Sequence, residues 1–461
     1  MEKLPLSLKI RYGAADLGIA LITSVTQFFL LFYYTDVAGI NPAIAGTALL
    51  VGKLTWDAIN DPLIGYLSDR TRSRFGRRRV YMFCGAIPLA LTAWLLLSLP
   101  QGLTGAAAFL AVFVTFLLMD TFHTLVSVPY YAMTPELTYD YNERGSLTSI
   151  RMVYSVIGYI LGAATTTVIA GLLVSQVGLT LRGAWSGTGL IFGAIAAITV
   201  LFTALSVRER HEAEVKLSKM PPLKAVRSTF HNRPFNIMLV IFFISSFSFT
   251  LLTALVPYFI IYQLKMKEAV PIVLLIMLLA IMIFLIPAQM LSKRINKGPA
   301  YALGLLIASL AIMATFFLPP APTPLIYLIA FVAGMGFSGQ WVFPWSMIPD
   351  VIEYDQYQTG ERREGIYYGI WALLQKFTNA FGLAVSGWAL AWFGYVANAE
   401  QTPQALFGIR LFFSLVPALL LLITLPMLVR FPITRQSHAE MLEKLRQRGE
   451  VAYSEDLKAA R

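Results

Sequence analysis

Long apolar segments follow one another along this entire sequence, and they limit its fold more than any other feature. Each segment of about 18 or more apolar residues is long enough to cross a hydrocarbon core of roughly 30 Å as a helix. Of the 461 residues, 57% are hydrophobic and only 13% are charged, whereas a soluble domain carries about 25% charged residues. The sequence therefore predicts an all-α membrane protein with no large soluble domain.

The spacing of the apolar segments predicts twelve transmembrane helices. Their expected positions are 13–34, 42–67, 80–99, 106–133, 149–174, 187–206, 236–263, 269–291, 300–318, 324–348, 365–394 and 407–429. Lys and Arg gather in alternate loops, as in 70–79, 208–233 and 293–297, and both termini fall on that side. Because basic loops remain in the cytoplasm, we expect a multi-pass protein of the cell membrane with both termini cytoplasmic.

The longest polar stretch divides the helices into six and six. We expect an N-terminal half at 1–207, a cytoplasmic linker at 208–235, a C-terminal half at 236–430 and a cytoplasmic tail at 431–461. Pro135-Glu136-Leu137 and Pro349-Asp350-Val351 follow the fourth and tenth helices, as two parallel halves predict. The tail has helically spaced apolar residues and is interpreted either as a membrane-surface helix or as a solvated segment.

The net positive charge of the chain is explained by its membrane topology. A formal net charge of +11 is expected where basic residues hold loops on one side of a membrane, so we do not expect nucleic acid as a partner. The single Cys84 excludes an intramolecular disulfide. Met1–Arg11 is short and basic, and no small-residue cleavage site follows it, so we expect an uncleaved first helix.

Ionisable side chains inside the expected second helix indicate a cation site. Asp57 and Asp61 are four residues apart and share a helix face, with Asn60 beside them. Two nearby carboxylates repel unless a positive charge lies between them, and a proton or a hard cation such as Na⁺ meets that need. The alternative is a structural set of ion pairs, such as Lys53 with Asp57. Pro62 removes a backbone donor and is expected to disturb the helix one turn earlier.

Other expected helices present polar faces as well. Asp120, Thr124 and Ser127 line one face of the fourth helix, and His123 lies beside it. Further polar clusters and aromatic residues that a ligand can stack on are Asp16, Thr23, Gln27, Lys376, Asn379, Tyr130, Tyr131, Trp341, Trp345 and Trp371. Ionisable groups in a membrane face one another or an aqueous cavity, so these residues predict a central cavity. Each aromatic residue alone is better explained by packing or by a place at the membrane interface.

The loop from Asp69 to Arg79 is dense with arginine. Topology and anionic headgroups explain it fully. It also suits a cytoplasmic gate that closes between the halves, for which we single out Asp69, Arg70, Arg77 and Arg363.

Several motifs together resemble the glycoside-pentoside-hexuronide:cation symporters, the family of melibiose permease. They are Tyr33-Tyr34-Thr35-Asp36, Trp56 to Pro62, Asp69 to Arg79, Val128-Pro129-Tyr130-Tyr131, and Gly360-Glu361-Arg362 with Gly365 to Lys376. The resemblance covers nearly the whole chain. It implies the major facilitator fold and alternating access around a central cavity.

The resemblance also implies roles for particular residues. The family's cation ligands match Asp57, Asn60, Asp61 and Thr124, and its lysine and arginine near that site match Lys376 and Arg151. The two aspartates that hold a galactoside fall on Ala20 and Ser127, and the stacking tryptophan falls on Tyr131. Carboxylates lie nearby on the same helices. We therefore take as substrate-site candidates Asp16, Ala20, Asp120, Ser127, Tyr131, Arg151, Trp345 and Lys376.

The function that these features predict is symport of a sugar or glycoside, driven by Na⁺ or H⁺, by a monomer in contact with membrane lipids. A cation that offsets the repulsion between Asp57 and Asp61 lets the cavity close, and Lys376 is expected to replace it in the empty carrier. No cofactor beyond the coupling ion is expected. The alternatives are transport of a lysophospholipid or other non-sugar solute, which loss of the sugar aspartates allows, and a transporter-like sensor. An enzyme is not expected, since the sequence shows no nucleophile with a base and no phosphate-binding loop.

Overall fold

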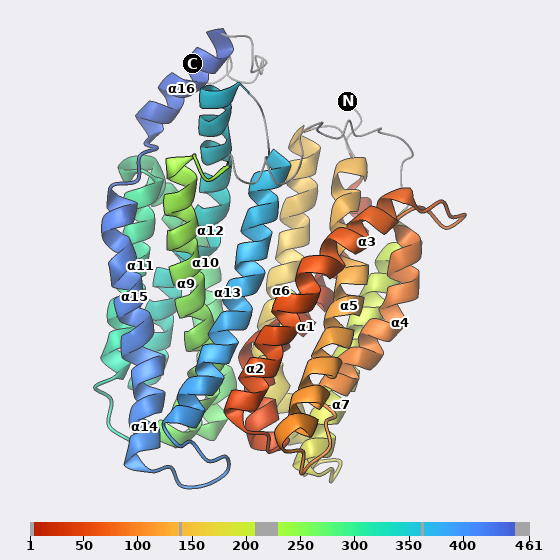
Figure 1. Ribbon diagram of the computed structural model, residues 1–461, viewed down its shortest axis with the longest axis vertical. Coiled ribbons are helices and arrows are strands. Elements are labelled where there is room, and N and C mark those ends of the chain that lie inside the picture. Colours follow the sequence, from red (N-terminus) through yellow and green to blue (C-terminus); the bar gives the residue numbers. More distant parts are fainter. Residues whose placement is uncertain (1–3, 138–140, 208–228, 361–363, 448–461) are drawn as a thin grey trace.

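The computed structural model describes residues 4–137, 141–207, 229–360 and 364–447, and the regular structure in these ranges is helical throughout (Figure 1). The helices lie side by side along one axis. Helix α1 begins at one end of this bundle, and helix α16 lies at the same end. We call it the terminal end, and the other end the opposite end.

The first part of the chain forms seven α-helices with two π-helical turns. The bounds are α1 Leu6–Phe32, η1 Tyr33–Val37, α2 Pro42–Gly52, η2 Lys53–Asp57, α3 Ala58–Arg70, α4 Arg79–Leu96, α5 Gly105–Leu137, α6 Tyr141–Ser175 and α7 Leu181–Ser206. The π-helical turn η2 lies directly before the turn that holds Pro62, where the sequence predicts a disturbed helix. Helices α2 and α3 continue each other through it.

The second part repeats this pattern. The bounds are α9 Arg233–Tyr258, η3 Phe259–Gln263, η4 Lys267–Ala269, α10 Val270–Ile295, α11 Lys297–Thr315, α12 Leu325–Thr359, α13 Glu364–Trp392, α14 Pro403–Arg410, η5 Leu411–Leu415, α15 Val416–Val429 and α16 Arg435–Gln447. We refer to α1–α7 as the N-terminal helices and to α9–α15 as the C-terminal helices. Most of the predicted linker at 208–235 lies outside the described residues, so the domain boundaries stay a prediction.

Within the described ranges, ten helical segments are long and apolar enough to cross a membrane. The other two predicted spans, 42–67 and 365–394, are also helical, formed by α2–η2–α3 and by α13. They carry the polar residues of the predicted site, which lower their mean hydropathy. The prediction of a multi-pass all-α membrane protein is confirmed, whereas the number twelve stays a prediction.

Small residues let helices approach closely. A side chain added at Gly158 of α6 would place its Cβ 2.1 Å from the carbonyl oxygen of Leu17 on α1. At Gly387 of α13, the added Cβ would lie 2.3 Å from the carbonyl oxygen of Pro42 on α2. Close backbone approach through small residues is the usual way in which helices associate in membranes. Both contacts are therefore too tight for any residue but glycine.

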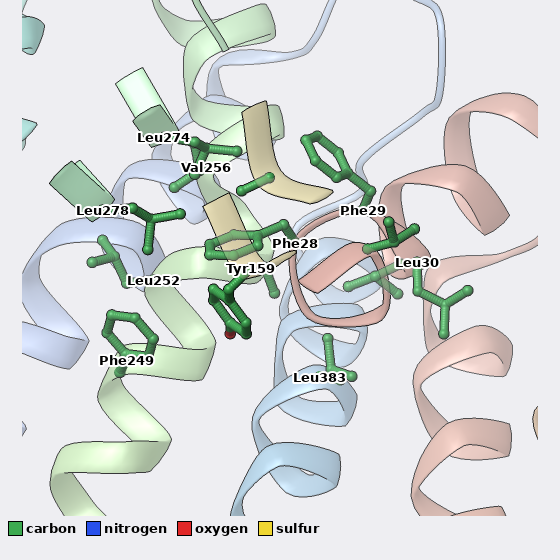
Figure 2. Packing of buried hydrophobic residues seen from close by; sticks show 14 of the residues in the cluster. Phe28, Phe29, Leu30, Tyr159, Phe249, Leu252, Val256, Leu274, Leu278 and Leu383 are labelled. Carbon is green, nitrogen blue, oxygen red and sulfur yellow. The ribbon is translucent and has the colours of Figure 1, made fainter. Parts of the chain in front are cut away.

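The N-terminal and C-terminal helices meet mainly through α2 with α13, α1 with α9, and α6 with α10. Helix α13 packs along α2, but it makes little contact with α3, which continues α2 toward the terminal end. An apolar layer fills the interface, and Figure 2 shows Phe28, Tyr159, Leu252, Leu278 and Leu383 converging there from α1, α6, α9, α10 and α13. The bundle is thus sealed toward the opposite end, and α3 and α13 diverge toward the terminal end.

Candidate functional site

Helix α5 carries four of the polar residues that the sequence singles out for the site. Asp120, Thr124, Ser127 and Tyr131 follow at intervals of four, three and four residues, so they lie along one face of α5. Asp120, Thr124 and Ser127 are buried and Tyr131 is 40% exposed. Asp16 of α1 and Arg151 of α6 contact Tyr131 on this face, and Asp61 of α3 contacts Thr124.

The predicted cation ligands of α3 and α5 lie together with a lysine. The Thr124 hydroxyl donates to Asp61 Oδ1 at 3.0 Å. Lys376 Nζ, on α13, forms an ion pair with Asp61 Oδ2. The ammonium group therefore rests on a carboxylate that the sequence predicts as a cation ligand, and it joins a C-terminal helix to an N-terminal one.

Asn60 and Asp120 lie beside this group. Asn60 is buried, and its Nδ2 donates to the backbone carbonyl of Asp120 at 3.5 Å. The Asp120 carboxylate forms an ion pair with Lys53 of η2 at 2.9 Å. The sequence offers Asp57 as an alternative partner of Lys53, but the side chain of Asp57 lies outside the described residues. The π-helical turn at η2 thus holds Lys53 against α5, one turn before the predicted ligands.

A second charged group forms where α1, α5 and α6 meet. Arg151 Nε lies 3.0 Å from Asp16 Oδ2, and the Tyr131 hydroxyl donates to Asp16 Oδ1 at 3.2 Å. The Arg151 guanidinium also lies over the Tyr131 ring, 4.8 Å from its centroid, and such cation–π contacts stabilise a partly desolvated arginine. An ion pair, a hydrogen bond and a cation–π contact therefore join these three substrate-site candidates in one cluster.

The remaining substrate-site candidates differ in exposure. Ala20 on α1 and Ser127 on α5 are buried. Trp345 on α12 is 48% exposed and packs edge-on against the buried Trp371 of α13 at 6.2 Å. A half-exposed tryptophan supported by a second ring is suited to stack on a ligand.

The predicted cytoplasmic gate is only partly described. The Arg70 guanidinium lies over the ring of Tyr66 on its own helix at 4.1 Å. Arg77 lies in the turn after α3, and the side chains of Asp69 and Arg363 are outside the described residues. The gate at this loop stays a prediction.

Two hydrogen-bonded features were not predicted from the sequence. Tyr12 and Tyr130 donate to each other's carbonyl oxygens at 2.7 and 2.9 Å, which clamps α1 to α5. Asp36 in η1, the turn that follows α1, accepts hydrogen bonds from Tyr262 and Tyr395, far along the chain. Asp36 belongs to a motif that carries the family resemblance, but the partners of a side chain from a distant helix cannot be derived from local spacing.

Comparison with known proteins identifies the family. The model of the MFS/sugar transport protein family matches residues 11–435. The chain belongs to this family. It is therefore a transporter of the major facilitator superfamily rather than an enzyme, as the sequence predicts.

The matched relatives span the same length as this chain. The uncharacterized symporter sll1374 of Synechocystis is 32% identical over 97% of this chain and 98% of its own. The putative glycoside/cation symporter YagG of Escherichia coli is 28% identical over 91% and 90%. The sodium-dependent lysophosphatidylcholine symporter 1-B of Danio rerio is 25% identical over 97% and 91%. An inward-facing bacterial homolog of the lysosomal transporter Spinster covers 95% of this chain and 97% of its own with a TM-score of 0.66 at 13% identity, which confirms the fold.

Proposed function

We propose that this protein is a cation-coupled symporter of a sugar or glycoside that works by alternating access. The observation that carries the proposal is the ion pair between Lys376 and Asp61, with Thr124 as a further hydrogen-bond donor to the same carboxylate. An ammonium group occupies the place where a coupling cation would neutralise negative charge. The family's description as sugar transporters and the symporter names of the relatives support the same function.

Coupling follows from exchange of one positive charge for another. Na⁺ or H⁺ binds at Asp61 and Thr124, together with Asp57 and Asn60, and releases Lys376 from the carboxylate. A hard cation prefers the oxygen ligands that these residues supply. Because Lys376 is on α13 and Asp61 on α3, the release changes a contact between the N-terminal and C-terminal helices. A substrate that binds better to the cation-loaded carrier then moves together with the cation.

The substrate site that we propose lies beside the cation site along α5. Asp16, Arg151 and Tyr131 offer hydrogen-bond donors and acceptors for sugar hydroxyls, and Trp345 offers a ring face. Ala20, Asp120, Ser127 and Lys376 complete the proposed lining. Buried Ala20 and Ser127 supply no carboxylate, so a substrate other than melibiose is expected.

From the basic loops we propose that the terminal end faces the cytoplasm. We also propose the cell membrane as the location and a monomer as the working unit. The end at which α2 and α13 pack together then faces the outside. In this orientation, the structure represents a carrier that is closed to the outside, with α3 and α13 apart on the cytoplasmic side.

The test is uptake into proteoliposomes of labelled glycosides, pentosides, hexuronides and lysophosphatidylcholine, with a Na⁺ gradient, a pH gradient or neither. We expect one sugar class to accumulate with one gradient, and Asp61→Asn to abolish the response to the gradient. Asp350→Asn removes another lysine-paired carboxylate, from α12, and serves as the matched control.

The other outcomes separate the alternatives. If a cation gradient drives only lysophosphatidylcholine, the proposed substrate changes from a sugar to a lysophospholipid, the substrate in the name of the Danio rerio relative. Binding without net transport would indicate a sensor. Cation-stimulated uptake that survives in Asp61→Asn would contradict the proposed cation site.

A further inference from the structure

The ends of α1 and α9 at the opposite end of the bundle have the same unusual geometry. Each helix finishes in a π-helical turn, η1 at Tyr33–Val37 and η3 at Phe259–Gln263. After η1, the backbone N–H groups of Ala38 and Ile40 donate to the carbonyl oxygens of Tyr33 and Tyr34. After η3, the N–H groups of Leu264 and Met266 donate in the same way to the carbonyl oxygens of Phe259 and Ile260. The two segments therefore occupy equivalent places in the first and second parts of the chain, and Asp36 and Tyr262 are each the fourth residue of their turn.

These equivalent residues bond to each other across the interface. The Tyr262 hydroxyl donates to Asp36 Oδ1, and the Tyr395 hydroxyl, from the turn after α13, donates to the same oxygen at 2.6 Å. Thr35 donates to Asp36 Oδ2 at 2.6 Å. One buried carboxylate on an N-terminal helix thus accepts hydrogen bonds from two tyrosines of the C-terminal part of the chain.

Neighbouring groups extend this contact. The Thr35 hydroxyl also bonds to the Tyr258 hydroxyl at 2.6 Å. Asn398, in a left-handed conformation with φ of 55°, donates its Nδ2 to the backbone carbonyl of Asp36 at 2.6 Å and its N–H to the Tyr262 hydroxyl at 3.0 Å. A π-helical turn leaves backbone groups without their usual partners and often marks a functional site. Here Asn398 uses one of those carbonyls to bind η1 to the segment after α13.

We propose that Asp36 is the latch that holds the opposite end closed. Its bonds to Tyr262 and Tyr395 exist only while the N-terminal and C-terminal helices meet at this end, because Asp36 lies on one side of the interface and both tyrosines lie on the other. When that end opens, the bonds to both tyrosines break and water replaces them. This inference rests on the proposed alternating access, and it places a gate at the end away from the arginine loop that the sequence indicates.

The energetics favour a latch over a permanent structural contact. Hydrogen bonds to a charged acceptor are roughly twice as strong as neutral ones, but a carboxylate that is exposed to water on opening regains hydration in exchange. The hydrogen bonds therefore stabilise the closed state and still allow it to open. Replacing the carboxylate by an amide removes the charge and turns one of the two acceptor oxygens into a donor, which faces either the Thr35 hydroxyl or the two tyrosine hydroxyls.

The experiment measures opening directly, without any transport substrate. Cys84, the single cysteine of the chain, is replaced by serine, and Thr253→Cys on α9 introduces a reporter. Thr253 is fully buried and contacts Gln27 of α1 at 3.5 Å. It lies nine residues before Tyr262, or about 13 Å along the helix, on the inner side of the latch. A membrane-impermeant maleimide is added to sided membrane vesicles from the side opposite the termini.

Asp36→Asn is expected to raise the labelling rate of this cysteine about tenfold or more, since it weakens hydrogen bonds to a charged group. Tyr262→Phe is expected to raise it by a smaller factor, and this milder variant decides the matter if Asp36→Asn does not fold. Tyr33→Phe is the matched control, because the Tyr33 hydroxyl accepts a hydrogen bond from Leu99 within the N-terminal helices.

The proposal is overturned if Tyr262→Phe leaves the labelling rate at the parent value, or if Tyr33→Phe raises it equally. The assay reports which end is open and not what is carried. If the protein transports no sugar, the proposed substrate is disproved and the labelling result still stands. If the protein accumulates sugar but the variants leave labelling unchanged, the latch alone is disproved.

Discussion

Lys376→Gln is expected to tighten cation binding to the substrate-free protein. A cation that binds Asp61 must first displace the lysine ammonium, so the strength of that ion pair opposes binding. Glutamine keeps the approximate length of the side chain and removes its charge. The substitution therefore removes a competitor without emptying the space that it fills.

The magnitude follows from the burial of the pair. The side chains of Lys376 and Asp61 are 29% and 31% exposed. Their ion pair is expected to lie between an exposed pair, at about 0–1 kcal/mol, and a fully buried pair, whose disruption costs about 3–5 kcal/mol. A value of about 2 kcal/mol corresponds to a roughly 30-fold lower dissociation constant for the cation.

The assay is calorimetric titration of the purified protein with Na⁺ in the absence of substrate. Lys297→Gln is the control, since Lys297 pairs with Asp350 on α12, a carboxylate outside the proposed site. A dissociation constant that is unchanged, or raised, in Lys376→Gln would refute the idea that the ammonium competes with the cation.

Three further predictions concern other parts of the molecule. Arg151→Lys is expected to lower substrate affinity at least about tenfold without abolishing cation binding, because lysine cannot keep the planar contact over the Tyr131 ring; equilibrium binding of both ligands checks this. Gly158→Ala is expected to lower the thermal midpoint by several degrees, whereas Gly171→Ala on the same helix, where nothing lies within 4 Å, is expected to be neutral. A hydrogen bond to Glu353 at 2.6 Å raises the pKa of His438 on α16. The charged form of His438 therefore stabilises docking of α16 below about pH 6.5, and this stabilisation is lost as the pH rises through the raised pKa. Amide hydrogen exchange of α16 measures the docking. Protection of α16 that does not change with pH would contradict this role of His438.

The course of the chain through the membrane could be predicted from the sequence because the apolar segments and the loop charges each carry the information locally. The expected helices at 42–67 and 365–394 appear where polar residues weaken that signal. The ends of other expected helices differ by several residues, as at α12, expected at 324–348, which continues past Pro349 to Thr359. Proline removes one backbone donor, but in a packed helix this does not force an end.

The site was predictable to the extent that its residues share a helix face. The spacing of Asp120, Thr124 and Ser127 placed them along one face of α5, and the family resemblance brought in Lys376 and Arg151. Which cation pairs with which carboxylate could not be derived, because it depends on how separate helices pack. The bonds from Tyr262 and Tyr395 to Asp36 join positions more than 200 residues apart, and no local pattern indicates them.

The central claim is that substrate and cation move together through the site at Asp61. The most direct measurement uses proteoliposomes without any cation gradient, in which an inward gradient of the transported sugar is imposed and uptake of radioactive Na⁺ and the internal pH are followed. We predict that the sugar gradient drives uphill entry of one of the two cations, and that Asp61→Asn abolishes this entry. Sugar entry that moves neither Na⁺ nor H⁺ would contradict the account and identify the protein as a uniporter.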